Sequence, residues 1–277
     1  RLDHRRAGRP VQGRAGDRAL VADQRRAEIL TSLTAIEAEK GVCILFACES
    51  GSRGWGFASP DSDYDVRFLY VHPLPWYLRV RPQRDVIEQP ITGDLDINGW
   101  ELRKALGLLG KGNATLIEWL DSPIVYRADA VFLQRLRALA ESVYQPERAF
   151  HHYVHMARDN YRDFLTRERV RLKKYLYVLR PLLATLWIEQ DRGPVPMRFE
   201  TLVETLIDAP KLRAAIDQLL VIKRSVGEAE VGAPLPLLNA FINRELTRLA
   251  SVAPPLARPV DEAALDQLLL DTLLGPG

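Results

Sequence analysis

The stretch that decides the fold runs from Ala47 to Phe57 and reads Ala-Cys-Glu-Ser-Gly-Ser-Arg-Gly-Trp-Gly-Phe. An apolar run, residues 42–47, precedes the glycines and is short enough for a buried strand. Glycine permits unusual backbone dihedrals, so the Gly-Ser-Arg-Gly segment ends that strand in a tight turn. Strand character returns from Tyr64 to Val71, after a turn at Pro60. Two strands joined by a glycine turn therefore organise this part of the chain.

Acidic side chains gather at the start of the second strand. Alternation along a strand places Asp63, Asp65 and Arg67 on the same face. Two carboxylates side by side repel each other unless a cation lies between them. Mg²⁺ prefers carboxylate oxygens and keeps coordination positions for phosphate, while free N–H groups in a turn such as Gly51-Ser52 favour an anion. The order of turn and acids therefore indicates a site for phosphate and metal.

These residues also resemble a known signature. Gly51-Ser52 followed by Asp63-x-Asp65, eleven residues after the serine, resembles the motif of the DNA polymerase β superfamily of nucleotidyltransferases. The longer string from Glu49 to Phe68 resembles the RNA-ligase-associated bacterial branch, and the resemblance extends from about residue 29 to about residue 200. It implies an α+β fold, in which a nucleotidyltransferase domain with a short mixed sheet and flanking helices precedes an all-α helical domain.

The resemblance implies three catalytic aspartates that hold two Mg²⁺ ions, for which Mn²⁺ can substitute. Asp63 and Asp65 would contact both metals, and the third carboxylate would come from a neighbouring strand, in an apolar-acid-apolar context. Residues 95–97, Leu-Asp-Ile, match that context and nominate Asp96 as the ligand of the acceptor-side metal. Asp94 is the competing candidate, and its alternative role is that of a solvated turn residue.

Around the turn, Gly51 and Ser52 are expected to hold the β- and γ-phosphates through backbone N–H groups and the hydroxyl. Arg53 is expected either to add positive charge to those phosphates or to point outward as a surface arginine. Glu49, directly before the turn, is a candidate for a structural cap rather than for catalysis.

A later basic helix is the second candidate element. Its leucines form an apolar stripe at helical spacing: Leu172, Leu176, Leu179 and Leu183. Lys173, Tyr177 and Arg180 share another stripe, read either as a solvated basic face or as a nucleotide contact. The resemblance favours the second reading and assigns Lys173 and Lys174 to the triphosphate and Tyr177 to the ribose or base. Pro181 lacks an N–H and leaves the Tyr177 carbonyl without its helical partner.

Composition limits the class of protein. The chain has 277 residues, of which 47% are hydrophobic and 27% charged, as expected of a globular protein with a substantial core. No apolar run reaches the length of a membrane helix, and there is no apolar signal core, so we expect a cytoplasmic protein without membrane contact. Cys43 and Cys48 are expected to be reduced thiols. A net charge of +2 means that a nucleic-acid partner must meet a local basic patch.

The chain is expected to divide into three parts. Residues 1–20 read as a flexible basic tail, residues 21–126 as the nucleotidyltransferase domain and residues 127–277 as the helical C-terminal domain. Within the middle part we expect a helix over 22–40, a strand over 84–89 and a helix over 99–110.

The predicted activity is metal-dependent transfer of NMP from an NTP, with ATP as the expected donor, to an acceptor hydroxyl and with release of pyrophosphate. An RNA end is the expected acceptor because of the family resemblance. A protein or small-molecule acceptor, or a catalytically silent nucleotide- or RNA-binding regulator, is the alternative. The sequence does not indicate an oligomeric state.

Overall fold

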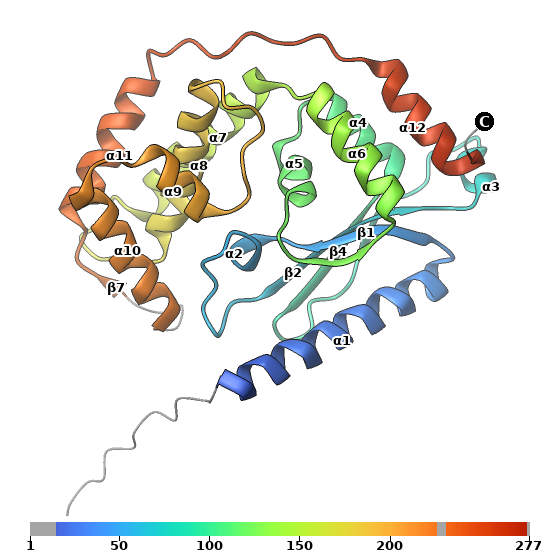
Figure 1. The fold of residues 1–277 in the computed structure, drawn as a ribbon, viewed down its shortest axis with the longest axis horizontal. Coiled ribbons are helices and arrows are strands. Elements are labelled where there is room, and N and C mark those ends of the chain that lie inside the picture. Colours follow the sequence, from blue (N-terminus) through green and yellow to red (C-terminus); the bar gives the residue numbers. More distant parts are fainter. Residues whose placement is uncertain (1–14, 226–230, 276–277) are drawn as a thin grey trace, which may run out of the picture.

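The computed structural model describes residues 15–225 and 231–275. Its centre is a five-stranded sheet in the order β3-β4-β2-β1-β5 (Figure 1). The strands are β1 (Cys43–Glu49), β2 (Tyr64–Val71), β3 (Val86–Glu88), β4 (Leu95–Glu101) and β5 (Val125–Ala128). β2 and β4 run parallel, whereas the other neighbouring strands run antiparallel, so the sheet is mixed as the sequence predicted.

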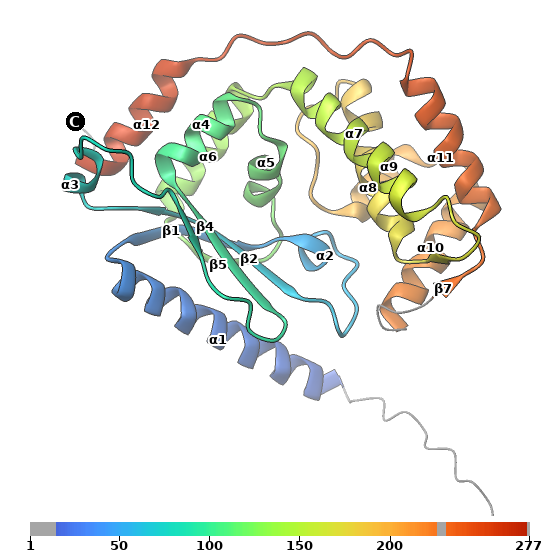
Figure 2. The same ribbon diagram turned by 180° about the vertical axis from the view of Figure 1, so that it is seen from behind.

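Helices cover both faces of the sheet (Figures 1 and 2). α1 (Ala15–Lys40) lies on one face, where Ile29, Leu33 and Ile36 are buried with side chains of β1, β2, β4 and β5. The other face carries α2 (Gly51–Gly54), α4 (Leu102–Gly110), α5 (Ala114–Leu120) and α6 (Ala130–Ser142), while α3 (Leu74–Tyr77) lies in the loop after β2. The sheet is therefore the middle layer of three.

The second half of the chain is mainly helical. Its helices are α7 (Pro146–Phe164), α8 (Lys174–Glu189), α9 (Phe199–Leu206), α10 (Pro210–Ser225) and α11 (Pro236–Leu249). Two short strands, β6 (Val170–Arg171) and β7 (Val231–Gly232), pair within it. The predicted leucine stripe is buried throughout, and it packs in the same core as the helices over the sheet, although Leu172 precedes α8.

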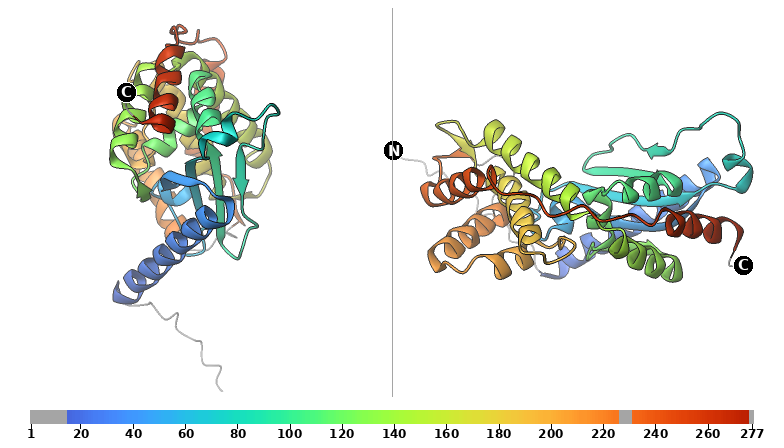
Figure 3. Two further views of the ribbon diagram at one scale, coloured as in Figure 1. Left: turned by 90° about the vertical axis from the view of Figure 1, so that its right-hand side faces the viewer. Right: turned by 90° about the horizontal axis from the view of Figure 1, so that it is seen from above.

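The last helix returns to the first half of the chain. α12 (Glu262–Leu274) packs against α4 and α6, after a long segment that crosses the molecule from α11 (Figure 3). The expected boundary between residues 126 and 127 lies inside β5, which pairs with β1. The division into two domains stays a prediction. The expected boundary would divide β5, and α12 of the second part packs on α4 of the first.

Some boundaries differ from those expected. The predicted tail lies mostly outside the described residues, and residues 15–20 already belong to α1. The helix expected from residue 99 begins at Leu102, because Gly99 continues β4. A Cβ at Gly99 would lie 2.2 Å from the Phe68 ring, so the glycine lets these neighbouring strands pack closely.

The carbonyl that Pro181 leaves without a helical donor has another partner. Asn160 donates a 2.9 Å hydrogen bond to this Tyr177 carbonyl. Both cysteines are free thiols. No helix in residues 15–225 and 231–275 is long and apolar enough to cross a membrane.

Candidate active site

The glycine turn is shaped by its contact with the acidic strand. Gly51 has φ +57°, and a Cβ at this position would lie 2.0 Å from Asp65 Oδ2, so only glycine fits. Gly54 is equally confined, because its Cβ would lie 2.4 Å from the Met197 side chain. Gly51, Ser52 and Arg53 form the first turn of α2, where backbone N–H groups have no acceptor within the helix. The turn therefore presents its donors next to a carboxylate.

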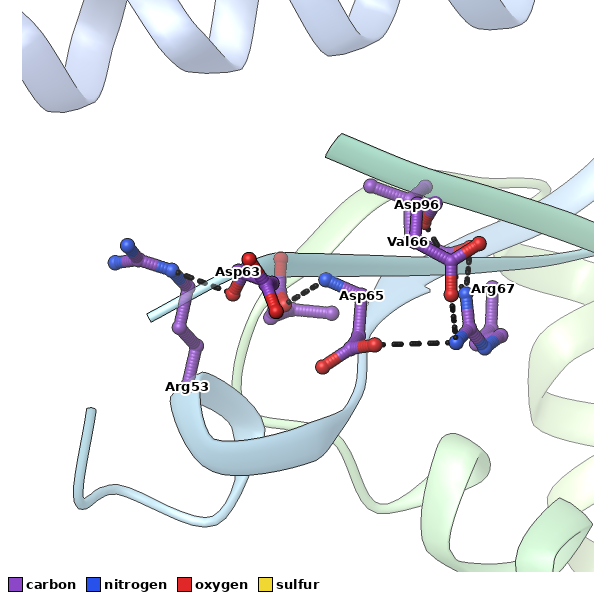
Figure 4. Close-up of polar contacts among 7 residues, drawn as sticks. Arg53, Asp63, Asp65, Val66, Arg67 and Asp96 are labelled. Carbon is purple, nitrogen blue, oxygen red and sulfur yellow. Dashed lines mark hydrogen bonds and ion pairs between the residues drawn. The ribbon is translucent and has the colours of Figure 1, made fainter. Parts of the chain in front are cut away.

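Asp65 and Asp96 lie side by side. They are register partners in the parallel pair β2–β4, so both side chains leave the same face of the sheet. Figure 4 shows the two carboxylates turned toward the guanidinium of Arg67. Arg67 Nη2 is 3.1 Å from Asp65 Oδ1 and 2.7 Å from Asp96 Oδ2. The predicted meeting of Asp65 and Asp96 is thus present, whereas the guanidinium between them was not predicted.

Asp94 takes a different position. It forms a 2.7 Å ion pair with Arg25 of α1, and its side chain is 40% exposed. Its partner is thus a residue of α1, whereas Asp96 pairs with the arginine that also holds Asp65. Between the two candidates for the third carboxylate, the structure favours Asp96.

The environment of Asp65 disfavours its charge. Burial is the largest cause that raises the pKa of this carboxyl, and the charges of Asp96 and Asp63 raise it further. Arg67 acts in the opposite direction and lowers the pKa. Among the charges that favour the ionised form of this carboxyl, Arg67 makes the largest contribution.

Glu49 supports Asp65 from inside the sheet. The glutamate is fully buried, and one oxygen accepts a 2.7 Å hydrogen bond from the Asp65 N–H. The other oxygen accepts a hydrogen bond from the Tyr126 hydroxyl. Burial raises the pKa of Glu49 to about 7, although both hydrogen bonds lower it. Glu49 was expected as a structural cap, but α2 has no side-chain cap, and the carboxylate instead bonds to the backbone of β2 and to Tyr126.

Arg53 braces the loop that leads into β2. Its Nε donates to the Asp63 carbonyl at 3.0 Å and its Nη2 to the Ser62 carbonyl at 2.6 Å. The guanidinium also lies 3.6 Å from the centre of the Tyr64 ring. A phosphate contact by Arg53 stays a prediction, and it would compete with these bonds.

α10 holds the same loop from the helical half. The Lys223 ammonium, 3% exposed, donates to Ser59 Oγ at 2.7 Å and to Ser62 Oγ at 3.3 Å. Arg224 donates to the Gly56 carbonyl at 3.2 Å. These contacts could not be predicted from local sequence patterns, because about 160 residues separate Lys223 from the loop.

The acids form a pair rather than a trio. Asp63 is exposed, and its backbone carbonyl accepts the hydrogen bond from Arg53. In the part of the chain that the structure describes, no three His, Cys, Asp or Glu side chains are grouped to hold a metal ion. Asp65 and Asp96 supply the hard oxygen donors that a divalent cation prefers, so this pair fits such an ion. The assignment of Asp63 as a third ligand stays a prediction.

The predicted basic helix begins beside the turn. The Tyr177 ring packs edge-on against Trp55 at 5.9 Å and Phe57 at 6.4 Å. Lys174 Nζ lies 4.8 Å from the Tyr177 ring and 4.0 Å from that of Phe164. Lys173 is the half-buried residue directly before α8. Tyr177 therefore lies against the Gly-Ser turn segment, while the nucleotide contacts of all three residues stay predictions.

Arg180 differs from the expected solvated or nucleotide-facing stripe. It is 2% exposed and forms a 2.8 Å ion pair with Glu118 of α5, while its guanidinium lies over the Trp55 ring. Glu118 also accepts hydrogen bonds from Tyr153 at 2.5 Å and Trp55 at 3.3 Å. This buried network fastens the turn to the helical half, and sequence spacing alone could not reveal its partners.

The chain has recognisable relatives. The sequence model of the family RlaP, described as the RNA repair pathway DNA polymerase beta family, matches residues 26–271. The uncharacterized protein YcgL of Bacillus subtilis (strain 168) is 44% identical over 247 residues, which cover 88% of this chain and 95% of YcgL. A solved nucleotidyltransferase-like protein from Exiguobacterium sibiricum is similar at 14% identity and a TM-score of 0.31, over 89% of this chain and 78% of that chain.

Proposed function

Because the chain belongs to the RNA repair pathway DNA polymerase beta family, it is a nucleotidyltransferase, and we propose that its acceptor is the hydroxyl of an RNA end. In this proposal ATP donates AMP, a bond forms between the acceptor oxygen and the α-phosphorus, and pyrophosphate leaves. Family membership implies an NTP substrate, whereas the choice of ATP and of RNA is part of the proposal.

The observation that carries the proposal is the acid pair beside the glycine turn. Asp65 and Asp96 are register partners, and Asp65 Oδ2 faces Gly51. The N–H groups of the turn can donate hydrogen bonds to the negatively charged β- and γ-phosphates, since helix N-termini favour anions. Asp65 and Asp96, with Asp63 as the proposed third ligand, would hold divalent Mg²⁺. When bound, Mg²⁺ would neutralise the charge that develops on the phosphates.

The proposed roles of the remaining residues follow from their positions. Lys173 and Lys174, at the start of α8, would add positive charge near the triphosphate, and Tyr177 would contact the ribose or base. Glu49 keeps the backbone of Asp65 in place, so that its carboxylate faces the turn. These groups bind and orient the nucleotide, and no covalent intermediate with the protein is required.

A basic and aromatic pocket supports the choice of a nucleic-acid acceptor. An open pocket of about 430 Å³ is lined by side chains that include Arg26, Arg53, Tyr64 and Tyr126. Arg53 also bonds to the backbone of Asp63, so the pocket lies next to the proposed site. Arginines bind phosphates, and aromatic rings and guanidinium planes stack on bases.

The proposal is tested with ATP labelled at the α-phosphate and, in parallel, at the γ-phosphate, in the presence of Mg²⁺. The acceptor is an RNA with a free 3′-hydroxyl, beside the same RNA with a 3′-phosphate. We expect the α-label to enter the hydroxyl-ended RNA and the γ-label to appear in pyrophosphate. Label found in a protein or a small molecule, and not in RNA, would show that the acceptor belongs to that other class. Absence of ATP turnover with every acceptor would contradict the proposal and favour the silent regulator.

A further inference from the structure

The guanidinium of Arg67 lies where a cation bridging Asp65 and Asp96 would lie (Figure 4). Its Nη2 donates to one carboxylate oxygen of each aspartate, at 3.1 and 2.7 Å. Its Nη1 donates to the main-chain carbonyls of Val66 at 3.0 Å and Asp96 at 3.1 Å. Four acceptors, all from β2 and β4, therefore fix the position of one guanidinium.

The ion pairs of Arg67 with Asp65 and Asp96 are partly buried. The Arg67 side chain is 18% exposed, and the side chains of Asp65 and Asp96 are 30% and 31% exposed. Ion pairs that are partly withdrawn from water are screened less than exposed ones. A divalent cation and a guanidinium cannot share the space between the two carboxylates, because like charges at such short distance repel strongly.

Each aspartate has one carboxylate oxygen bonded to Arg67 and one that is not. Asp65 Oδ1 and Asp96 Oδ2 accept from the same Nη2, and the Asp96 backbone carbonyl accepts from Nη1. Asp65 Oδ2 faces Gly51 and thus the place proposed for the triphosphate. A cation that arrives with the nucleotide can therefore reach Asp65 Oδ2 while Arg67 stays in place, but a cation that bridges Asp65 Oδ1 and Asp96 Oδ2 meets the guanidinium.

We propose that Arg67 is an internal counter-ion that competes with a divalent cation for the position between Asp65 Oδ1 and Asp96 Oδ2, so that a cation bridging the two aspartates can bind only when the Arg67 side chain leaves. Arg67 is then a positioning residue that sets how tightly that cation binds. The inference rests on the proposed function only in taking Asp65 and Asp96 as the cation ligands. The opposite role, in which Arg67 supports the carboxylates as metal ligands, predicts that its loss weakens metal binding.

The test measures Mn²⁺ binding by electron paramagnetic resonance, on the full chain without nucleotide or RNA. Arg67→Met removes the charge and keeps a side chain of similar length. We expect it to bind Mn²⁺ roughly fivefold more tightly than the wild type, since an ion pair that opposes binding is gone. Adding Asp96→Asn to Arg67→Met should abolish the gain. The matched control is Arg25→Met, which removes the same charge from the Arg25–Asp94 pair and should leave Mn²⁺ affinity unchanged.

Unchanged or weaker Mn²⁺ binding by Arg67→Met, or an equal gain in Arg25→Met, would overturn the inference. If Arg67→Met fails to fold, the wild type provides the second measurement, by NMR of ¹⁵N-labelled arginine during a Mg²⁺ titration. The Arg67 signal, assigned by its absence from Arg67→Lys, should shift at saturation, and an unmoved signal would contradict displacement. Because these experiments contain no NTP, they are independent of whether the protein transfers nucleotides to RNA.

Discussion

Among single residues, Glu49 links the free energy of unfolding to pH. It is fully buried in β1, and its carboxylate accepts hydrogen bonds from the Asp65 N–H and the Tyr126 hydroxyl. Burial raises its pKa to about 7 in the folded protein. Between the ordinary pKa of a glutamate and pH 7, the folded state therefore binds more protons at this site than the unfolded state does.

This difference fixes the sign of a pH dependence. The unfolded carboxyl loses its proton as the pH rises through its ordinary pKa, while the folded carboxyl keeps it until about pH 7. The contribution of Glu49 to the free energy of unfolding should thus fall by roughly 2–4 kcal/mol from pH 4.5 to pH 7. Glu49→Gln should remove this part of the slope, because an amide does not titrate.

The measurement is urea unfolding of both proteins at pH 5 and pH 7.5, in EDTA. Glu88→Gln changes the same charge at an exposed position of β3 and should reproduce the wild-type difference between the two pH values. Identical pH slopes for Glu49→Gln and the wild type would show that Glu49 is not the group responsible.

Single residues also show where sequence reasoning succeeds. Alternation predicts the face of each aspartate within its own strand, because a few neighbouring residues determine it. That β2 and β4 are neighbours, with Asp65 beside Asp96, was implied by the family resemblance and not by the alternation. The same alternation put Arg67 on the face of Asp65, yet it assigned no partner to the arginine. Charge balance was the missed signal, since two adjacent carboxylates require a cation and the nearest one is two residues away.

At the scale of the element, α8 tolerates a proline in its interior because a neighbouring helix replaces the lost hydrogen bond. Asn160 of α7 donates to the Tyr177 carbonyl, which Pro181 cannot reach with an N–H. The sequence predicted the unsatisfied carbonyl, but not its donor, because α7 and α8 must pack together before Asn160 comes within reach.

We expect Asn160→Ala to lower the free energy of unfolding by about 1 kcal/mol, the usual contribution of one hydrogen bond. In a Pro181→Ala background the N–H of Ala at this position can donate to the Tyr177 carbonyl, so Asn160→Ala should lower the free energy of unfolding by less. Thermal or urea unfolding of the wild type, the two single variants and the double variant gives the coupling energy. Additive effects of the two substitutions would contradict the proposed replacement.

The start of α8 carries the prediction about nucleotide binding. Lys173→Ala or Lys174→Ala should weaken NTP binding about tenfold, because each removes a cation from the side proposed for the triphosphate. Lys40→Ala is the control, since Lys40 is exposed at the end of α1, before β1, whereas the turn follows β1. Calorimetry with a non-hydrolysable ATP analogue measures all three, and unchanged affinity in both α8 variants would leave this helix as a basic surface.

At the scale of the whole molecule, the site is held by contacts between distant parts of the chain. Arg180 of α8 pairs with Glu118 of α5, Lys223 of α10 anchors the Ser59–Ser62 loop, and α12 returns to pack on α4. Local periodicity predicted the buried leucine stripe, and the family resemblance implied the mixed sheet. They could not predict these cross-links, because each joins residues more than 60 positions apart.

Asp65 and Asp96 are proposed as the cation ligands for nucleotidyl transfer, and substitution by asparagine tests this assignment. Asp65→Asn and Asp96→Asn preserve side-chain shape and remove one charge each, while Asp94→Asn is the matched control on the neighbouring position. Pyrophosphate release from ATP is measured with Mg²⁺ and an acceptor on which the wild type works, after unfolding curves confirm that each variant is folded. Turnover should fall by about 10²–10³-fold in Asp65→Asn and Asp96→Asn and stay near the wild-type rate in Asp94→Asn. Wild-type turnover by Asp65→Asn would contradict the assignment of Asp65 as a cation ligand.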